Sequence, residues 1–223
     1  MDNIKLNIRV WDLPIRFFHW SMVGLLGGLW WTASMGEMQW HQVLGFVLLD
    51  LIVCRLIWGW IGSDTARFSF FLVSPKKVLQ YLEAKNRVEP ALGHNPMGGY
   101  MVIFLLLLLS VQLMSGLFAT DDIFTEGPLF HHVSPDTAAW LTWLHKNTFN
   151  VILAFAGMHI LAVLVHLFKG DNLITAMVTG KKRVVNNKGH QLKFTHACVA
   201  LGLFLVIGAA IFYFWGRPVL SML

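Results

Sequence analysis

Three histidines lie within a single long apolar run of this chain. The run from Ala139 to Phe168 can cross a bilayer and contains His145, His159 and His166. His145 and His159 are 14 residues apart. On an α-helix this is about four turns, so both side chains point to nearly one face, about 21 Å apart along the axis. A polar side chain inside a membrane needs a partner, and the partner that suits neutral imidazoles at two depths is a haem iron at each. The alternative is that these histidines hydrogen-bond to neighbouring helices.

The composition indicates an integral membrane protein that positions these histidines on helices. Of 223 residues, 56% are hydrophobic and 13% are charged, and the mean hydropathy is +0.60. Five apolar runs approach or exceed the roughly 18 residues that cross hydrocarbon: Phe17–Ser34, His41–Ile61, Pro96–Ala119, Ala139–Phe168 and Thr195–Trp215. The first run resembles a signal sequence, but no convincing small-residue cleavage site follows it, so we expect it to be a retained span. We predict an all-α membrane protein that forms one membrane domain over residues 1–223.

The basic residues lie on one side of the predicted membrane. The connections between Met35 and Trp40 and between Thr120 and Trp140 contain no Lys or Arg. The positive-inside rule therefore predicts a cytoplasmic N-terminus and a periplasmic C-terminus. The net charge of +5 is a topological signal, and we expect no nucleic-acid binding. The Lys and Arg residues that carry this signal are Lys5, Arg9 and Arg16; Arg67, Lys76, Lys77, Lys85 and Arg87; and Lys169, Lys181, Lys182, Arg183, Lys188 and Lys193.

This topology groups four histidines at two depths. His19 and His159 lie toward the cytoplasmic side, and His41 and His145 lie at the outer side. Two bis-imidazole sites follow, and because such a site fills both axial positions of a haem iron, it suits electron transfer better than chemistry on a substrate. The chain has no Cys-x-x-Cys-His motif, so any haem is non-covalent and of the b type. His166, seven residues after His159, is an alternative inner ligand.

Two arginines are candidates for binding the inner cofactor. Arg55 follows His41 by 14 residues on the same helix face and lies near the cytoplasmic surface. It can pair there with a haem propionate, or it can extend to the lipid headgroups. Arg16, which precedes the first span, is the second candidate. With Asp50, the same residues also fit a small proton-coupled transporter, but the chain lacks the internal repeat typical of that class.

The connections predict surface features. Ser74 and Pro75 are typical of a helix start, followed by an apolar stripe, and the segment from Gly170 to Arg183 is typical of a capped interfacial helix. The third connection is acidic, and we expect it to attract a basic redox protein; the alternative is that its charges only satisfy the topology rule and solubility. It contains Asp121, Asp122, Glu126 and Asp136, and also His131 and His132, which lack the third ligand that a divalent metal site requires.

Several segments resemble the bacterial di-haem cytochrome b561 family, which includes the b-type cytochrome subunit of nickel-iron hydrogenase. The segments are VWDLPIRFFHW, CRLIWGWIGSDTARFS, SPKKVLQYL, GHNPMGGYM and DNLITAMVTGKKR, and they cover residues from about 8 to 183. The resemblance implies a four-helix bundle over this range, with the span at about 195–215 lying outside it. It also implies haem ligation by His19, His41, His145 and His159.

We therefore predict a membrane cytochrome of the bacterial inner membrane with two b haems. As the resemblance implies, it exchanges electrons between the quinone pool and a periplasmic c-type cytochrome or oxidoreductase subunit. The sequence shows no catalytic constellation beyond the haem ligands. Whether the protein is an electron-transfer component alone or a quinol:acceptor oxidoreductase is therefore left open. A superoxide-reactive quinone reductase of the same fold is an alternative. A membrane metalloenzyme needs a clustered ligand set such as His-Glu-x-x-His, which the sequence lacks.

Overall fold

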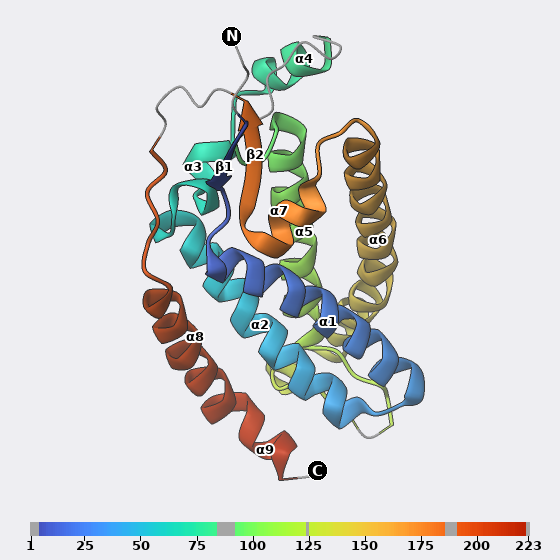
Figure 1. Cartoon of the computed structure of the whole chain (residues 1–223). Helices are drawn as coiled ribbons and strands as arrows, with labels where there is room; N and C mark the ends of the chain where they lie inside the picture. The colour runs from blue at the N-terminus through green and yellow to red at the C-terminus, as the bar shows by residue number, and fades with distance from the viewer. Residues whose placement is uncertain (1–4, 84–91, 124, 186–190, 222–223) are drawn as a thin grey trace. The chain divides into compact units, whose positions relative to one another are not determined.

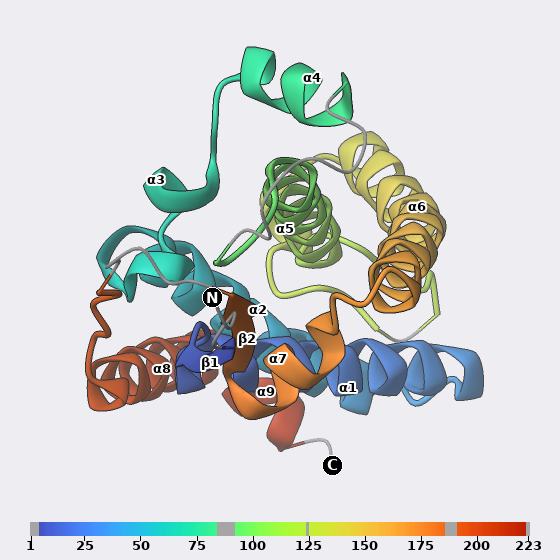
Figure 2. The ribbon, with the colours of Figure 1, turned by 45° about the horizontal axis from the view of Figure 1, so that its top comes forward.

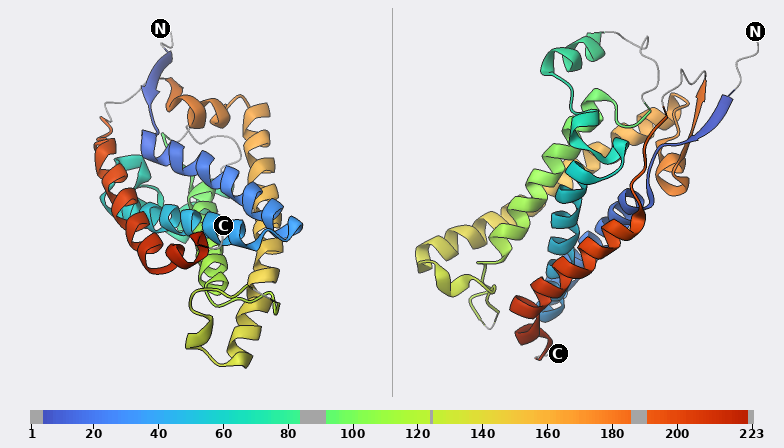
Figure 3. Two further views of the ribbon diagram at one scale, coloured as in Figure 1. Left: turned by 90° about the horizontal axis from the view of Figure 1, so that it is seen from below. Right: turned by 90° about the vertical axis from the view of Figure 1, so that its left-hand side faces the viewer.

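The computed structural model describes residues 5–83, 92–123, 125–185 and 191–221, and most of these residues are helical. The long helices are α1 (Leu13–Met35), α2 (Met38–Ile61), α5 (Pro96–Gly116), α6 (Pro135–Phe168) and α8 (Ala197–Ile211) (Figure 1). α8 continues through a π-helical turn, Phe212–Gly216, into α9 (Arg217–Leu220) (Figure 3). The shorter elements are α3 (Phe68–Phe71), α4 (Pro75–Glu83), α7 (Leu173–Thr179), two 3₁₀ turns at Asp64–Ala66 and Phe130–His132, and the strands β1 (Lys5–Arg9) and β2 (Lys181–Val185).

Four helices in the described ranges are long and apolar enough to cross a membrane. They are α2, α5, α6 and the combined segment Ala197–Leu220, and they coincide with four of the five predicted spans. α1 has 23 residues but is not among them, because its tryptophans, glycines and His19 lower its hydropathy. The all-α membrane fold is confirmed, and the first span stays a prediction.

The chain divides into two compact units. The first contains Met1–Phe18, Arg55–Phe104 and Met158–Ala200, and the second contains His19–Cys54, Leu105–Gly157 and Leu201–Leu223. Segments of α1, α2, α5, α6 and α8 therefore occur in both.

In the first unit, the start of α1 is fixed by a buried carboxylate. Asp12 Oδ1 accepts a hydrogen bond from Ile15 N at 2.8 Å, as an N-cap does, and its Oδ2 accepts one from Trp58 Nε1 at 2.9 Å. Asp12 is fully buried, so both hydrogen bonds are shielded from water. They join the start of α1 to the end of α2.

A small antiparallel ribbon also belongs to the first unit, and the sequence did not predict it. β1 pairs with β2 in the register Arg9↔Lys181 to Lys5↔Val185. The two strands are far apart in sequence, and their Lys and Arg residues interrupt the apolar alternation by which a strand is recognised. The helices predicted after Ser74 and after Gly170 are present as α4 and α7, but the basic end of the second segment belongs to β2, and the place of both helices at the membrane surface stays a prediction. α7 is capped by Asn172, whose side chain accepts from Thr175 N, and ends at Gly180 with φ of 78°.

In the second unit, the C-terminal part of α8, which lies outside the predicted four-helix bundle, packs against α2. Phe46 of α2, Leu117, Ile211 and Val219 form one buried cluster. Gly208 of α8 lies against Asp50, since a Cβ at Gly208 would come within 2.5 Å of Asp50 Oδ2. A larger residue at position 208 would therefore require the Asp50 carboxylate to move.

Candidate functional site

Two of the predicted ligand residues meet in the second unit. His41 stands near the start of α2, and His145 stands on α6. Their ring centroids are 6.2 Å apart and their planes are inclined by 86°. Both side chains are half-buried, so the pair is largely enclosed by the protein.

Hydrogen bonds fix the protonation of both rings. His41 Nδ1 lies 3.0 Å from the carbonyl oxygen of Leu29, and His145 Nδ1 lies 2.8 Å from that of Gln112. A carbonyl oxygen can only accept a hydrogen bond, so each Nδ1 carries the proton and donates it. Each Nε2 therefore keeps a lone pair, which is the form of histidine that binds a metal while its other nitrogen is held by a carbonyl. The lone pair of His145 Nε2 faces the side-chain amide of Gln112, whose Nε2 lies 3.4 Å away.

The ring separation fits one metal ion between the two imidazoles. With metal–nitrogen bonds of about 2 Å, two imidazoles on opposite sides of one iron have centroids about 6.3 Å apart, close to the observed spacing. Gly116 lies directly beside His145, and a Cβ there would come within 2.8 Å of its Cε1. Gln112 Oε1 is buried without a hydrogen-bond partner among the described residues. The pair and its surroundings fit a bis-histidine haem.

The other two predicted ligands belong to different units. His19 lies on α1 in the second unit, and His159 lies on α6 in the first. Both are half-buried. The inner ligand pair thus stays a prediction.

His166 is engaged by other groups of the first unit. Asn95 Oδ1 accepts from Gly98 N at 2.6 Å, so its Nδ2 is the atom that lies 3.1 Å from His166 Nε2 and donates to it. His166 Nδ1 faces Asp171 Oδ2 at 3.6 Å. The 3.1 Å contact at His166 Nε2 is shorter than the 3.4 Å contact that His145 Nε2 makes with the Gln112 amide. Because its Nε2 is engaged in this way, His166 is less suited than His159 to bind iron.

The two candidate arginines have N–H groups that lack acceptors. Arg55 is only 4% exposed, and its guanidinium lies over the rings of Phe68 and Phe18 at 5.3 and 6.0 Å. The side chain is therefore enclosed and does not extend to the headgroups. Arg55 Nη1 and Arg16 Nε are buried without a hydrogen-bond partner in the described part of the chain, while Arg16 Nη2 donates to the carbonyl of Val178. Such orphaned donors fit an anionic group such as a propionate.

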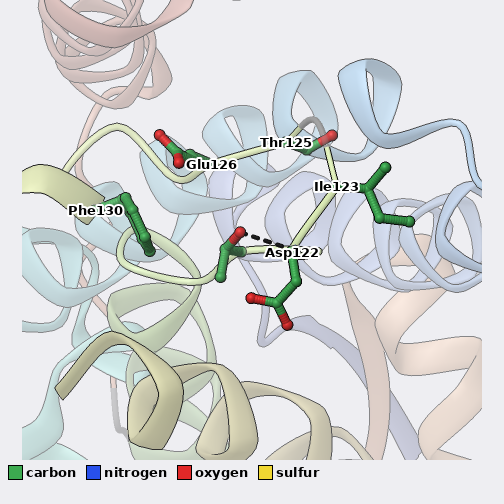
Figure 4. Close-up of a pocket in the computed structure, with 6 residues that line it drawn as sticks. Asp122, Ile123, Thr125, Glu126 and Phe130 are labelled. Atoms are coloured by element: carbon green, nitrogen blue, oxygen red, sulfur yellow. Dashed lines mark hydrogen bonds between the residues drawn. The ribbon is translucent and has the colours of Figure 1, made fainter. Parts of the chain in front are cut away.

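The acidic third connection forms a shallow pocket in the second unit. Its volume is about 240 Å³, and it is lined by Thr120, Asp122, Ile123, Thr125, Glu126 and Phe130 (Figure 4). Glu126 Oε2 lies 2.8 Å from His131 Nε2. Within the described ranges, no group of three or more His, Cys, Asp or Glu residues could hold a metal ion.

Sequence reasoning missed several residues of these sites. The carbonyls of Leu29 and Gln112 leave no sequence signal, because any residue type supplies one. Asp12 and Asn95, in contrast, precede Pro14 and Pro96 at helix starts, a pattern that predicts N-caps.

One comparison with known proteins gave a match. A family model described as prokaryotic cytochrome b561 matches residues 10–180 of the chain. Neither the search of curated proteins nor that of solved structures found a match.

Proposed function

Since the chain belongs to the prokaryotic cytochrome b561 family of membrane b-type cytochromes, which transfer electrons, we propose that it holds two b haems and moves electrons across the membrane. The observation that carries this proposal is the His41–His145 pair, in which each ring holds its proton on Nδ1 and the ring centroids are 6.2 Å apart. Haem supplies a reversible one-electron change at iron. His41 and His145 would hold the iron from two sides, and a haem held in this way would exclude other ligands and favour electron transfer. Residues 1–223 then form one membrane domain.

The inner haem is assigned to His19 and His159, with Arg55 and Arg16 at its propionates. The orphaned donors of the two arginines support this assignment, since a buried N–H group without an acceptor is costly. The Asn95 contact to His166 Nε2 favours His159 as the ligand.

Replacing Arg55 by leucine is expected to lower the midpoint potential of one haem, on the order of 50 mV, because a nearby positive charge favours the reduced state. The change is measured by a redox titration followed in the visible spectrum. Arg55→Lys retains the charge and should keep most of the potential. If the midpoint potentials of Arg55→Leu equal those of the native protein, Arg55 does not lie beside a haem.

The proposed orientation places the N-terminus in the cytoplasm and the C-terminus in the periplasm of a bacterial inner membrane. It is supported by the absence of Lys and Arg from the first and third connections. A reporter enzyme that is active only in the periplasm should work when fused after Leu223 and fail when fused after Lys188. Both fusion points lie outside the described residues. The reverse pattern would invert both haem assignments.

We assign quinol and a periplasmic redox protein as the two electron-exchange partners. Membrane-soluble quinol reaches a membrane protein from the bilayer, whereas the acidic third connection offers a surface for a water-soluble partner. The test uses vesicles that contain the protein and trapped ferricyanide, with quinol added outside. Ferricyanide reduction should be fast with the native protein and slow with His145→Ala. Equal rates, or a native rate equal to that of empty vesicles, would refute transmembrane transfer.

The third connection is expected to attract a basic c-type cytochrome. Asp122 and Asp136 are exposed, whereas Asp121 Oδ1 accepts hydrogen bonds from Ile123 N and Thr125 N and helps to shape the loop. The rate of electron transfer to a basic cytochrome should fall with salt, because charges are screened over a Debye length of roughly 8 Å at physiological ionic strength.

The matched variant removes the two exposed charges. Asp122→Asn with Asp136→Asn should show a slower rate at low salt and a weaker salt dependence in rapid mixing. Glu83→Gln, on α4, removes an exposed acid from the connection assigned to the cytoplasm and should behave like the native protein. If all three proteins react alike, the partner docks elsewhere.

A further inference from the structure

The ribbon of β1 and β2 presents cations on one face. In its antiparallel register, Arg9 lies opposite Lys181 and Asn7 lies opposite Arg183, so these four residues share a face. All four are exposed. Like charges directly opposite one another on a sheet destabilise the pairing. The ribbon therefore has a positively charged face, and a bound anion would reduce the repulsion between its charges.

The described acidic groups of the first unit do not supply that anion. Among the described residues, none of Arg9, Lys181 and Arg183 forms an ion pair. Arg9 instead lies over the ring of Phe194 at 4.4 Å. Asp64 is engaged by Arg67 and by Lys193 N, and Asp171 by Lys182.

The opposite face of the ribbon is anchored. Lys182 is only 8% exposed, and its Nζ lies 2.9 Å from Asp171 Oδ1. The same carboxylate faces His166 at the end of α6. The backbone N–H groups of Val10 and Trp11 donate to the carbonyl of Gly180, which holds the end of β1 against the turn before β2. The cationic face is thus held in a fixed position.

An exposed apolar stripe lies on α7, the helix that leads into β2. α7 leads through Gly180 directly into β2 (Figure 2). Ile174 and Val178 are four residues apart on α7, so they lie on one helix side, and they are 40% and 50% exposed. An apolar stripe beside a basic segment is the pattern of an element that lies in a membrane interface.

We propose that the exposed face of the β1–β2 ribbon binds the phosphate groups of anionic phospholipids in the leaflet that borders the first unit. Arg9, Lys181 and Arg183 contact the headgroups, and Ile174 and Val178 enter the boundary of the acyl chains. The charge complementarity and the adjacent apolar stripe together identify a lipid, because a soluble anion would make no use of the stripe.

The experiment compares two variants of the haem-loaded protein from which equal numbers of charges are removed. The ribbon variant carries Lys181→Gln and Arg183→Gln. The control carries Lys146→Gln and Arg217→Gln, which are exposed and lie in the second unit. Each protein is titrated in phosphatidylcholine nanodiscs or micelles with increasing phosphatidylglycerol, and retained lipid is counted by native mass spectrometry. A parallel titration uses inorganic phosphate.

The ribbon variant should show an apparent affinity for phosphatidylglycerol about tenfold weaker than that of the native protein, and the control should stay close to native. Retention equal to native in the ribbon variant would overturn the proposal, as would an equal loss in both variants. Competition by inorganic phosphate that removes all bound phosphatidylglycerol would identify a free-phosphate site instead. Because the haem content is measured in each sample, failure here is distinguishable from failure of the proposed haem function.

Discussion

His159→Ala is expected to bind half as much haem as the native protein, because the variant loses the inner haem and keeps the outer one. The remaining haem depends on His41 and His145, whose Nδ1 atoms are held by backbone carbonyls that the substitution does not touch. The haem per polypeptide is measured as the pyridine complex, and the reduced spectrum should show one of two components missing.

The matched control is His166→Ala. His166 lies seven residues after His159 on α6 and on nearly the same helix face. His166 accepts a hydrogen bond from Asn95 and faces Asp171, so its loss should affect stability more than haem content. A full haem complement in His159→Ala together with a loss in His166→Ala would exchange the two assignments.

Gly116→Ala is expected to remove most of the outer haem. The added Cβ would come within 2.8 Å of Cε1 and 3.0 Å of Nδ1 of His145, distances that force the ring to move. Movement of the ring breaks its hydrogen bond to the Gln112 carbonyl and misdirects Nε2. The haem content and the reduced spectrum again report the loss, now of the component that His159→Ala retains.

The control substitution is Gly202→Ala on α8, where nothing lies within 4 Å of the added Cβ. It should keep both haems. If Gly116→Ala also keeps both haems with unchanged spectra, the ring of His145 is not confined as the structure indicates, and the assignment of the outer site is weakened.

The residues that could be predicted from the sequence are those whose type is unusual for their surroundings. An imidazole or a guanidinium inside an apolar run is conspicuous, so His41, His145 and Arg55 were found without a structure. The helix start at Ser74-Pro75 and the capped helix after Gly170 were predicted for a different reason. Capping residues and a first-turn proline have specific roles in the backbone at helix ends.

The features that could not be predicted depend on contacts between distant segments. The Leu29 and Gln112 carbonyls become ligand supports only because α1 and α5 approach the two histidines. The β1–β2 ribbon joins segments at opposite ends of the matched range, so neither strand indicates its partner. The role of Gly208 follows from its closeness to Asp50, and the sequence does not indicate that these two residues meet.

The haem content of the purified native protein, together with its reduced spectrum, tests the central claim most directly. We expect two non-covalent b haems per polypeptide, both low-spin, and a spectrum that carbon monoxide does not change, because histidines would fill both axial positions. A single haem, a high-spin component that binds carbon monoxide, or a preparation without haem would contradict it.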